Sequence, residues 1–176
     1  MSAAADSAGR TGHFRLHKLE VAIAAAIVVV DQITKALVRA HVPLYDTVPV
    51  ISGILNLTHV RNSGAAFGFL NAVDFPYKST ILALVSTAAF VGIAMYAARA
   101  STHERVARFG LAMILAGAIG NLIDRVAFGS VVDFVDVVFG SWHFWAFNVA
   151  DSAITLGVIA MLIDMMGAGR NVPTTS

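Results

Sequence analysis

Four long apolar stretches recur along the chain, separated by segments that are richer in polar residues. They cover residues 19–38, 80–98, 106–126 and 148–166, and each is near the roughly 20 residues that a helix needs to cross a bilayer. The second stretch contains no charged residue, whereas the other three are apolar at one end and polar at the other. The pattern therefore predicts four transmembrane helices.

Residues 40–77 break this pattern, because they are too many for a turn and too apolar for a linker. Their β-branched and aromatic residues are interrupted by Pro49 and Gly53, which is typical of short strands and turns. Residues 131–138 (VVDFVDVV) alternate loosely and are a candidate partner for these strands. We therefore expect a small β-rich platform on the outer face of the membrane. Its interfacial aromatic residues would be Phe67, Phe69, Phe75, Trp142, Phe144 and Trp145.

Composition supports a membrane protein and excludes several kinds of site. Of 176 residues, 57% are hydrophobic and 13% are charged, against about a quarter charged in a typical soluble domain. The absence of cysteine excludes disulfides, thiolate nucleophiles and cysteine-ligated metals. His13 and His17 have the spacing of a metal pair, but they stand in a basic tail and no HExxH motif is present. We expect no metal, no cofactor and no nucleic-acid partner.

The distribution of basic residues predicts the orientation. An even number of spans puts both termini on one side, and the segments on that side hold more Lys and Arg than the opposite segments. We therefore expect cytoplasmic tails at residues 1–18 and 167–176 around a single membrane domain at residues 19–166. This domain would include the β-rich cradle at 40–77 and an active-site loop at 127–147. The first apolar run lacks a cleavage site, so it is interpreted as a retained span.

Polar residues at the helix ends are predicted to meet at one depth near the outer membrane surface. The first helix runs outward, so Asp31 and Lys35, which are four residues apart, share a face near its outer end and can pair. The third helix also runs outward and the fourth runs inward, so their polar ends meet. These ends carry Asn121, Asp124 and Arg125 on the third helix, Asn148 and Asp151 on the fourth, and Asp133 in the connection between them. Ionisable groups at the ends of membrane spans are costly to keep, which makes this group a candidate site.

Paired carboxyl groups in a water-poor place suit hydrolysis. Both cannot stay ionised cheaply, so one keeps a proton and the pair titrates as a unit. The carboxylate can then take a proton from water while the carboxylic acid donates one to the scissile amide. The neutral amides of Asn62, Asn121 and Asn148 can orient groups without adding charge. Arg125 can neutralise surplus negative charge or bind a phosphate headgroup.

The residues alone leave open which carboxylate partners Asp151. Asp124 has the better helical placement, but its neighbour Arg125 favours a permanently ionised structural pair. Asp133 has no cation beside it and can be held facing Asp151 by the loop.

Structural interpretations of the same residues compete with the chemical ones. An aspartate at a helix start, such as Asp151, often serves to cap the helix. Asp31 and Lys35 are equally well explained as a structural ion pair. Asp136 is interpreted as a solvated residue and left out of the candidate site.

The sequence resembles the lipoprotein signal peptidases (signal peptidase II) of bacteria. Five blocks occur in the order and spacing of that family, and the likeness covers about residues 20–166. Each block is weak alone, whereas five in order are specific. The blocks are DQITK at 31–35, RNSGAAFGF at 61–69, GNLIDR at 120–125, VVDF at 131–134 and FNVADS at 147–152.

The resemblance implies a mostly α, four-helix aspartyl protease of the bacterial inner membrane, N-in and C-in, with a periplasmic β-cradle. It implies cleavage of a prolipoprotein just before a cysteine that already carries diacylglycerol. It also implies a catalytic dyad of Asp133 and Asp151, which decides between the two candidate partners of Asp151. Ser63, which stands where Thr is common in the family, is a minor departure. The expected substrate-binding or positioning residues are Asp31, Lys35, Asn62, Asn121, Asp124, Arg125 and Asn148.

Two other functions compete with a peptidase. A small proton-coupled carrier would place a carboxylate near the bilayer midplane and often shows repeat symmetry, whereas the acids here cluster at one surface. A catalytically inert assembly factor would have lost the paired carboxylates, which are present. We therefore expect a monomeric enzyme whose partners are a diacylglyceryl prolipoprotein and the surrounding lipids.

Overall fold

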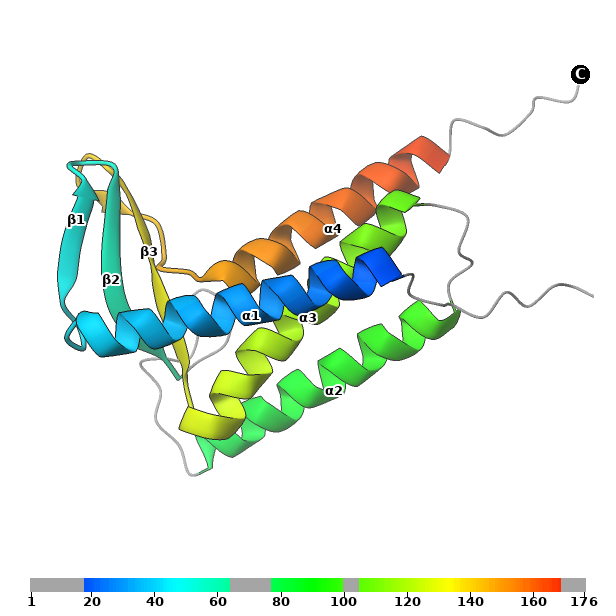
Figure 1. Ribbon diagram of the computed structural model, residues 1–176, viewed down its shortest axis with the longest axis horizontal. Coiled ribbons are helices and arrows are strands. Elements are labelled where there is room, and N and C mark those ends of the chain that lie inside the picture. The colour runs from blue at the N-terminus through cyan, green and yellow to red at the C-terminus, as the bar shows by residue number, and fades with distance from the viewer. Residues whose placement is uncertain (1–17, 64–76, 100–104, 169–176) are drawn as a thin grey trace, which may run out of the picture.

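The computed structural model describes residues 18–63, 77–99 and 105–168 of the chain. Four helices occupy the places that the apolar pattern predicts: α1 (Lys18–His41), α2 (Lys78–Arg99), α3 (Arg105–Phe128) and α4 (Val149–Ala168). Figure 1 shows these helices lengthwise beside one another, with a small sheet across one end. The protein is therefore mostly helical with a small antiparallel sheet.

Helix α3 lies at the centre of the bundle and contacts the other three helices. Its packing against α4 depends on small residues, because they let two backbones approach closely. A Cβ atom added to Gly110 of α3 would lie only 2.7 Å from the carbonyl oxygen of Gly157 of α4. Further along α3, a Cβ atom added to Gly117 would lie 2.7 Å from the Cγ1 atom of Ile154, so the first turns of α4 pack closely against the half of α3 that carries Asn121 and Asp124.

The sheet contains the strands β1 (Thr47–Ile51), β2 (Leu55–Asn62), β3 (Val131–Phe139) and β4 (Trp142–His143), in that order and antiparallel. The predicted pairing of residues 131–138 with the 40–77 segment is confirmed, because β3 pairs with β2. Asn62 lies opposite Val131, and Val60 lies opposite Asp133. The segment that we expected to be a loop at 127–147 consists largely of β3 and β4, so Asp133 is held by a strand.

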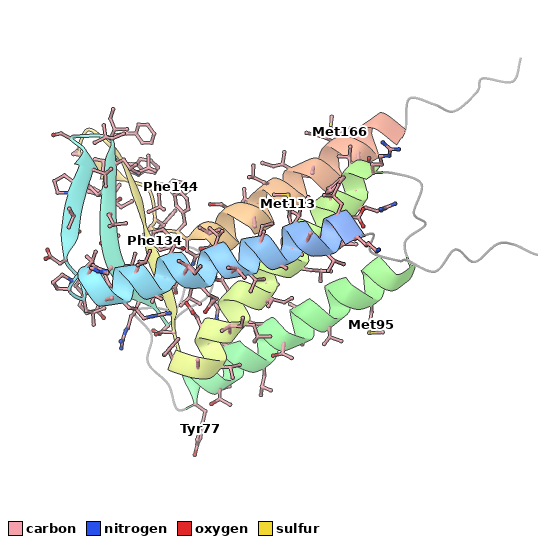
Figure 2. All side chains as sticks on the ribbon, in the orientation of Figure 1. Tyr77, Met95, Met113, Phe134, Phe144 and Met166 are labelled. Carbon is pink, nitrogen blue, oxygen red and sulfur yellow. The ribbon has the colours of Figure 1, made fainter. Side chains whose placement is uncertain are left out.

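The sheet is fixed to the C-terminal end of α1 by a small apolar core. Val38 and Val42, at and just beyond the end of that helix, pack with Val132 and Phe134 of β3, and all four are buried. Phe134 and Phe144 lie on the side of the sheet that faces the helices (Figure 2). The core therefore fixes β3, and with it Asp133, relative to the helix bundle.

The outer surfaces of the helices are apolar. Leu37 of α1 and Met166 of α4 are 53% and 76% exposed, and Figure 2 shows Met166 projecting from the end of its helix. Among the described residues, α1 and α3 are each long and apolar enough to cross a membrane. Trp142 of β4, and Phe144 and Trp145 just after that strand, are exposed. The other predicted interfacial aromatics, Phe67, Phe69 and Phe75, lie outside the described residues, as do most of the expected tails.

Candidate active site

Helix α4 begins with a reciprocal cap formed by Asn148 and Asp151. The side-chain oxygen of Asn148 accepts a hydrogen bond of 2.9 Å from the backbone N–H of Asp151. In return, the Asp151 carboxylate accepts one of 3.3 Å from the backbone N–H of Asn148. This is a capping box with Asp in the place of Glu. The structural and chemical interpretations of these two residues are thus compatible, because the cap fixes both side chains at the helix start.

Asp133 projects from β3 toward this cap and is 3% exposed. One carboxylate oxygen accepts a hydrogen bond of 3.0 Å from the amide of Asn62, which is at the end of the adjacent strand. The other accepts a bond of 2.6 Å from the Nδ2 atom of Asn148. Two amides from different elements therefore hold the Asp133 side chain.

Asp151 is held by a third amide. Asn121 of α3 donates a hydrogen bond of 2.8 Å from Nδ2 to the Asp151 carboxylate. Asn148 contacts Asp133 through its side-chain nitrogen and Asp151 through its side-chain oxygen and backbone N–H. The two carboxylates are thus joined through a single residue, and the three predicted asparagines all contact one or both of them.

The surroundings of Asp133 favour its protonated form. Burial raises the pKa of Asp133 from 3.8 to about 7, and the charge of nearby Asp151 acts in the same direction. The hydrogen bonds from Asn62 and Asn148 and the charge of Lys35 oppose these effects but do not cancel them. Asp133 therefore keeps a proton over part of the neutral pH range, as a general acid in hydrolysis requires.

A cavity of about 690 Å³ opens at the two carboxylates. Its polar end is formed by the acids with Asn62, Asn121 and Arg125, and the rest of its wall is mainly apolar. The apolar part comes from the segment before α4 and from the first turns of α4. It includes Phe144, Trp145, Ala146, Phe147, Ile154 and Leu156. The cavity can accommodate an apolar substrate with its scissile bond beside the acids.

A second polar cluster lies behind the dyad, away from the cavity wall. The predicted pair of Asp31 and Lys35 is confirmed, with 2.9 Å between the carboxylate oxygen and Nζ and both side chains completely buried. Lys35 also lies 3.4 Å from Asp124, which is completely buried. The sequence suggested Arg125 as the cation for Asp124, but α1 supplies the cations Lys35 and Arg39, the latter at 3.5 Å. Arg125 lines the cavity, close enough to Asp151, Asp133 and Asp124 for their charges to act on it.

The comparisons with known proteins agree with this site. A sequence profile described as Signal peptidase (SPase) II matches residues 23–167. The chain belongs to the signal peptidase II family. It is 48% identical over 141 residues to a lipoprotein signal peptidase of Desulforapulum autotrophicum, covering 80% of this chain and 86% of that protein. A lipoprotein signal peptidase of Nitratidesulfovibrio vulgaris is 42% identical over 149 residues, covering 85% of this chain and 90% of that protein.

Solved structures extend the likeness to the fold. A structure described as a bacterial membrane enzyme has a TM-score of 0.80 and 31% sequence identity, and the match covers 93% of this chain and 97% of that chain. A second structure of the same description has a TM-score of 0.76 and 30% identity. The protein is therefore an aspartic endopeptidase of the signal peptidase II type, a bacterial membrane protease of lipoprotein processing. The comparisons do not support the carrier interpretation.

Sequence reasoning missed two members of the second cluster. Gln32 donates hydrogen bonds to Asp31 at 3.1 Å and to Asp124 at 3.4 Å, so it joins α1 to α3. It follows Asp31 directly in the DQITK block, which was the available signal. Arg39 lies four residues after Lys35 and therefore on the same helix face.

The interpretation of Asp136 as a solvated residue is wrong. Asp136 is 8% exposed on β3. It accepts a hydrogen bond of 3.0 Å from Asn56 of β2, and His143 of β4 lies 2.9 Å away. It thus links three strands of the sheet and is not among the cavity residues.

Proposed function

We propose that Asp133 and Asp151 are the catalytic dyad with which this signal peptidase II cuts diacylglyceryl-modified prolipoproteins just before the lipidated cysteine. The observation that carries the proposal is the position of Asn148. This residue contacts both carboxylates, and both line the same cavity. Asp133 and Asp151 are the two acids on the wall of that cavity.

The reaction follows from one proton shared by the pair. The ionised carboxyl group removes a proton from a water molecule, whose oxygen attacks the scissile carbonyl carbon. The protonated carboxyl group donates to the carbonyl oxygen. The first carboxyl group then donates the proton it took from water to the leaving nitrogen, and the second carboxylate takes a proton back from a hydroxyl of the tetrahedral diol. The C–N bond breaks, giving a free carboxyl group and an amine, and the dyad again holds one proton.

The asparagines supply orientation in this reaction. Asn62 and Asn148 hold opposite oxygens of Asp133, at 3.0 and 2.6 Å, while Asn121 holds Asp151 at 2.8 Å. Neither carboxyl group can turn freely. Fixed reacting groups avoid an entropic cost in the transition state, which is where most of the acceleration arises.

The wall of the cavity suits a lipid-bearing precursor. The acids lie at one end of a mainly apolar surface formed by residues such as Phe144, Trp145, Ile154 and Leu156. A signal helix and the acyl chains of the substrate would both partition into the bilayer, so the substrate would approach sideways from the membrane. Arg125 is a polar wall residue on the same cavity and would contact a carbonyl or headgroup oxygen of the substrate.

The proposed placement in the membrane rests on the lengths of the helices and on the position of the dyad at one end of the bundle. The four helices would all span the inner membrane with both termini in the cytoplasm, and the cradle with the dyad would lie at the periplasmic face. Support comes from the lengths of α2 and α4, 22 and 20 residues, which match those needed for a span. All the residues proposed for the site come from one chain, so a monomer of residues 19–166 with short tails would suffice for catalysis.

A cleavage assay tests the proposal. Purified protein in detergent is incubated with a synthetic precursor peptide whose cysteine carries diacylglycerol, and the products are identified by mass. Asp133→Asn and Asp151→Asn are expected to abolish cleavage while leaving the protein folded. Asp136→Asn is the matched control, because it makes the same change on β3 outside the cavity, and it should remain active. Substantial activity in either dyad variant would contradict the proposal.

A further inference from the structure

Two buried carboxylates outside the cavity each accept a hydrogen bond from the residue directly before a member of the dyad. Asp31 of α1 accepts one of 2.9 Å from the backbone N–H of Ala150, which precedes Asp151. Asp124 of α3 accepts one of 3.2 Å from the backbone N–H of Val132, which precedes Asp133. The main chain directly before each dyad residue is therefore hydrogen-bonded to a helix through an acid that does not line the substrate cavity.

Lys35 joins these two acids. Its Nζ atom lies 2.9 Å from Asp31 and 3.4 Å from Asp124. It also donates a hydrogen bond of 2.9 Å to the side-chain oxygen of Asn121. An ammonium group has three N–H donors, and these three oxygens lie around it. All three charged side chains are completely buried.

We propose that Asp31, Lys35 and Asp124 form a brace that sets the separation of Asp133 and Asp151, with Lys35 as its central positioning residue. The proposal rests on the dyad assignment made above. It assigns Lys35 a role in kcat that an ordinary structural ion pair would not have.

The third contact of Lys35 reaches a dyad side chain through Asn121. Because the ammonium group faces the oxygen of Asn121, the amide nitrogen must face the other way, where it donates to Asp151 at 2.8 Å. A turned amide would place its own N–H groups against the ammonium, which has no acceptor. Lys35 thus fixes the orientation of the hydrogen bond that holds Asp151.

Gly120 of α3 leaves room for the Asp31 side chain, because a glycine has no Cβ atom at this point of contact. A Cβ atom on Gly120 of α3 would lie 2.6 Å from the carboxylate oxygen of Asp31. Gln32 donates to Asp31, to Asp124 and to the carbonyl oxygen of Gly120. Lys35 and Arg39 balance the two acids in charge, so the brace adds no net negative charge behind the dyad.

Stability alone does not account for this cluster. Buried ion pairs are expensive to desolvate, and apolar residues of similar size often stabilise a protein as well or better. The contacts of this cluster lead to Ala150, Val132 and Asn121, which are each adjacent to or bonded to a dyad residue. Its effect is therefore expected on the geometry of catalysis.

The test replaces Lys35 by methionine, which has a similar length and no charge. Lys35→Met is expected to lower kcat at least about tenfold, as a displaced reacting group does, with KM within about twofold. The limb of the pH profile of kcat that reports Asp133 should also move to higher pH, because the charge of Lys35 lowers the pKa of Asp133. Glu20→Gln is the matched control, since it breaks the buried ion pair with Arg108 at the other end of α1. It should lower thermal stability and leave the kcat of the folded enzyme and the pH profile unchanged.

A second variant covers a failure of Lys35→Met to fold. Asp31→Asn combined with Lys35→Met removes one acid and one base, so the cluster keeps its charge balance, and the kcat loss should persist. Wild-type kcat and pH profile in a folded Lys35 variant would overturn the brace, even if the dyad variants are inactive. Activity in Asp133→Asn or Asp151→Asn would instead overturn the dyad assignment, so the two failures are distinguishable.

Discussion

The side-chain nitrogen of Asn148 lies 2.6 Å from the carboxylate of Asp133, while the side-chain oxygen of the same residue caps the helix that carries Asp151. One asparagine therefore joins strand β3 to the start of helix α4, and β4 lies between these two elements in the chain. Its two ends have separable tasks, which mutations can distinguish.

Asn148→Ser should separate capping from catalysis. A serine hydroxyl can still accept the bond from the Asp151 N–H, but it is too short to donate to Asp133. We expect stability near that of the wild type and a kcat lower by about tenfold or more. Asn148→Ala should lose a further increment of about 1 kcal/mol in unfolding free energy, because the cap is removed. Thermal unfolding and cleavage rates in detergent check both, and equal stability of the two variants would contradict the capping role.

Asp133 should make the protein less stable as pH rises. Its pKa is about 7 when folded and near 3.8 when unfolded, so between these values the folded state holds a proton that the unfolded chain has released. The stabilisation is complete below about pH 4 and is lost above about pH 7. Asp133→Asn should therefore be more stable than the wild type at about pH 8, by about 1–4 kcal/mol, with little difference near pH 4. A variant that is less stable than the wild type at high pH would refute this.

Gly120→Ala should disturb the buried cluster of Asp31, Lys35 and Asp124 that lies next to the dyad. The new Cβ would lie 2.6 Å from an oxygen of Asp31 and 3.1 Å from its Cγ atom. We expect a loss of about 1–3 kcal/mol in unfolding free energy and lower activity, because the buried cluster must shift. Gly92→Ala in α2 is the matched control, since nothing lies within 4 Å of the added atom. There the same change should stabilise the protein by about 0.5–1 kcal/mol. Thermal unfolding of both variants decides the matter, and equal effects would exclude the contact with Asp31 as the cause.

Phe144 should contribute to substrate binding more than to turnover. It lines the cavity, and its ring packs edge-on against those of Trp142 and Phe147 with centroids 5.9 Å away. Phe144→Ala should raise KM several-fold with a smaller change in kcat, as expected for loss of uniform binding. Phe139→Ala, at the exposed end of the same aromatic row and not on the cavity wall, should leave KM unchanged. A fall in kcat alone for Phe144→Ala would contradict the assignment.

The helices and two pairs of site residues could be predicted because they follow local periodicity, whereas the choice of Asp133 came from the family resemblance. Apolar runs of span length gave the four helices, and the spacings of Asp31 with Lys35 and of Asn148 with Asp151 placed each pair on one face. The pairing of β3 with β2 could be anticipated from alternation, but its register could not. That register places Asn62 beside Val131 and so brings its amide to Asp133.

Contacts between residues on elements that are distant in the chain could not be predicted from the sequence. Arg125 follows Asp124 in the chain, yet consecutive helical residues point in different directions, and the cations beside Asp124 include Arg39 of α1. Asp136 appeared solvated because its partners Asn56 and His143 are on other strands. Neither set of contacts has a periodic signal, since the first depends on how α1 packs against α3 and the second on how β3 pairs with β2 and β4.

The central claim is that Asp133 and Asp151 act as one unit, and the cleavage rates of Asp133→Asn, Asp151→Asn and the double variant test it most directly. If the two share the reaction, each single variant should be as inactive toward the diacylglyceryl peptide as the double variant, because removing either group removes the whole function. If one single variant retains substantial activity, or if the two losses add independently in the double variant, the dyad assignment is contradicted.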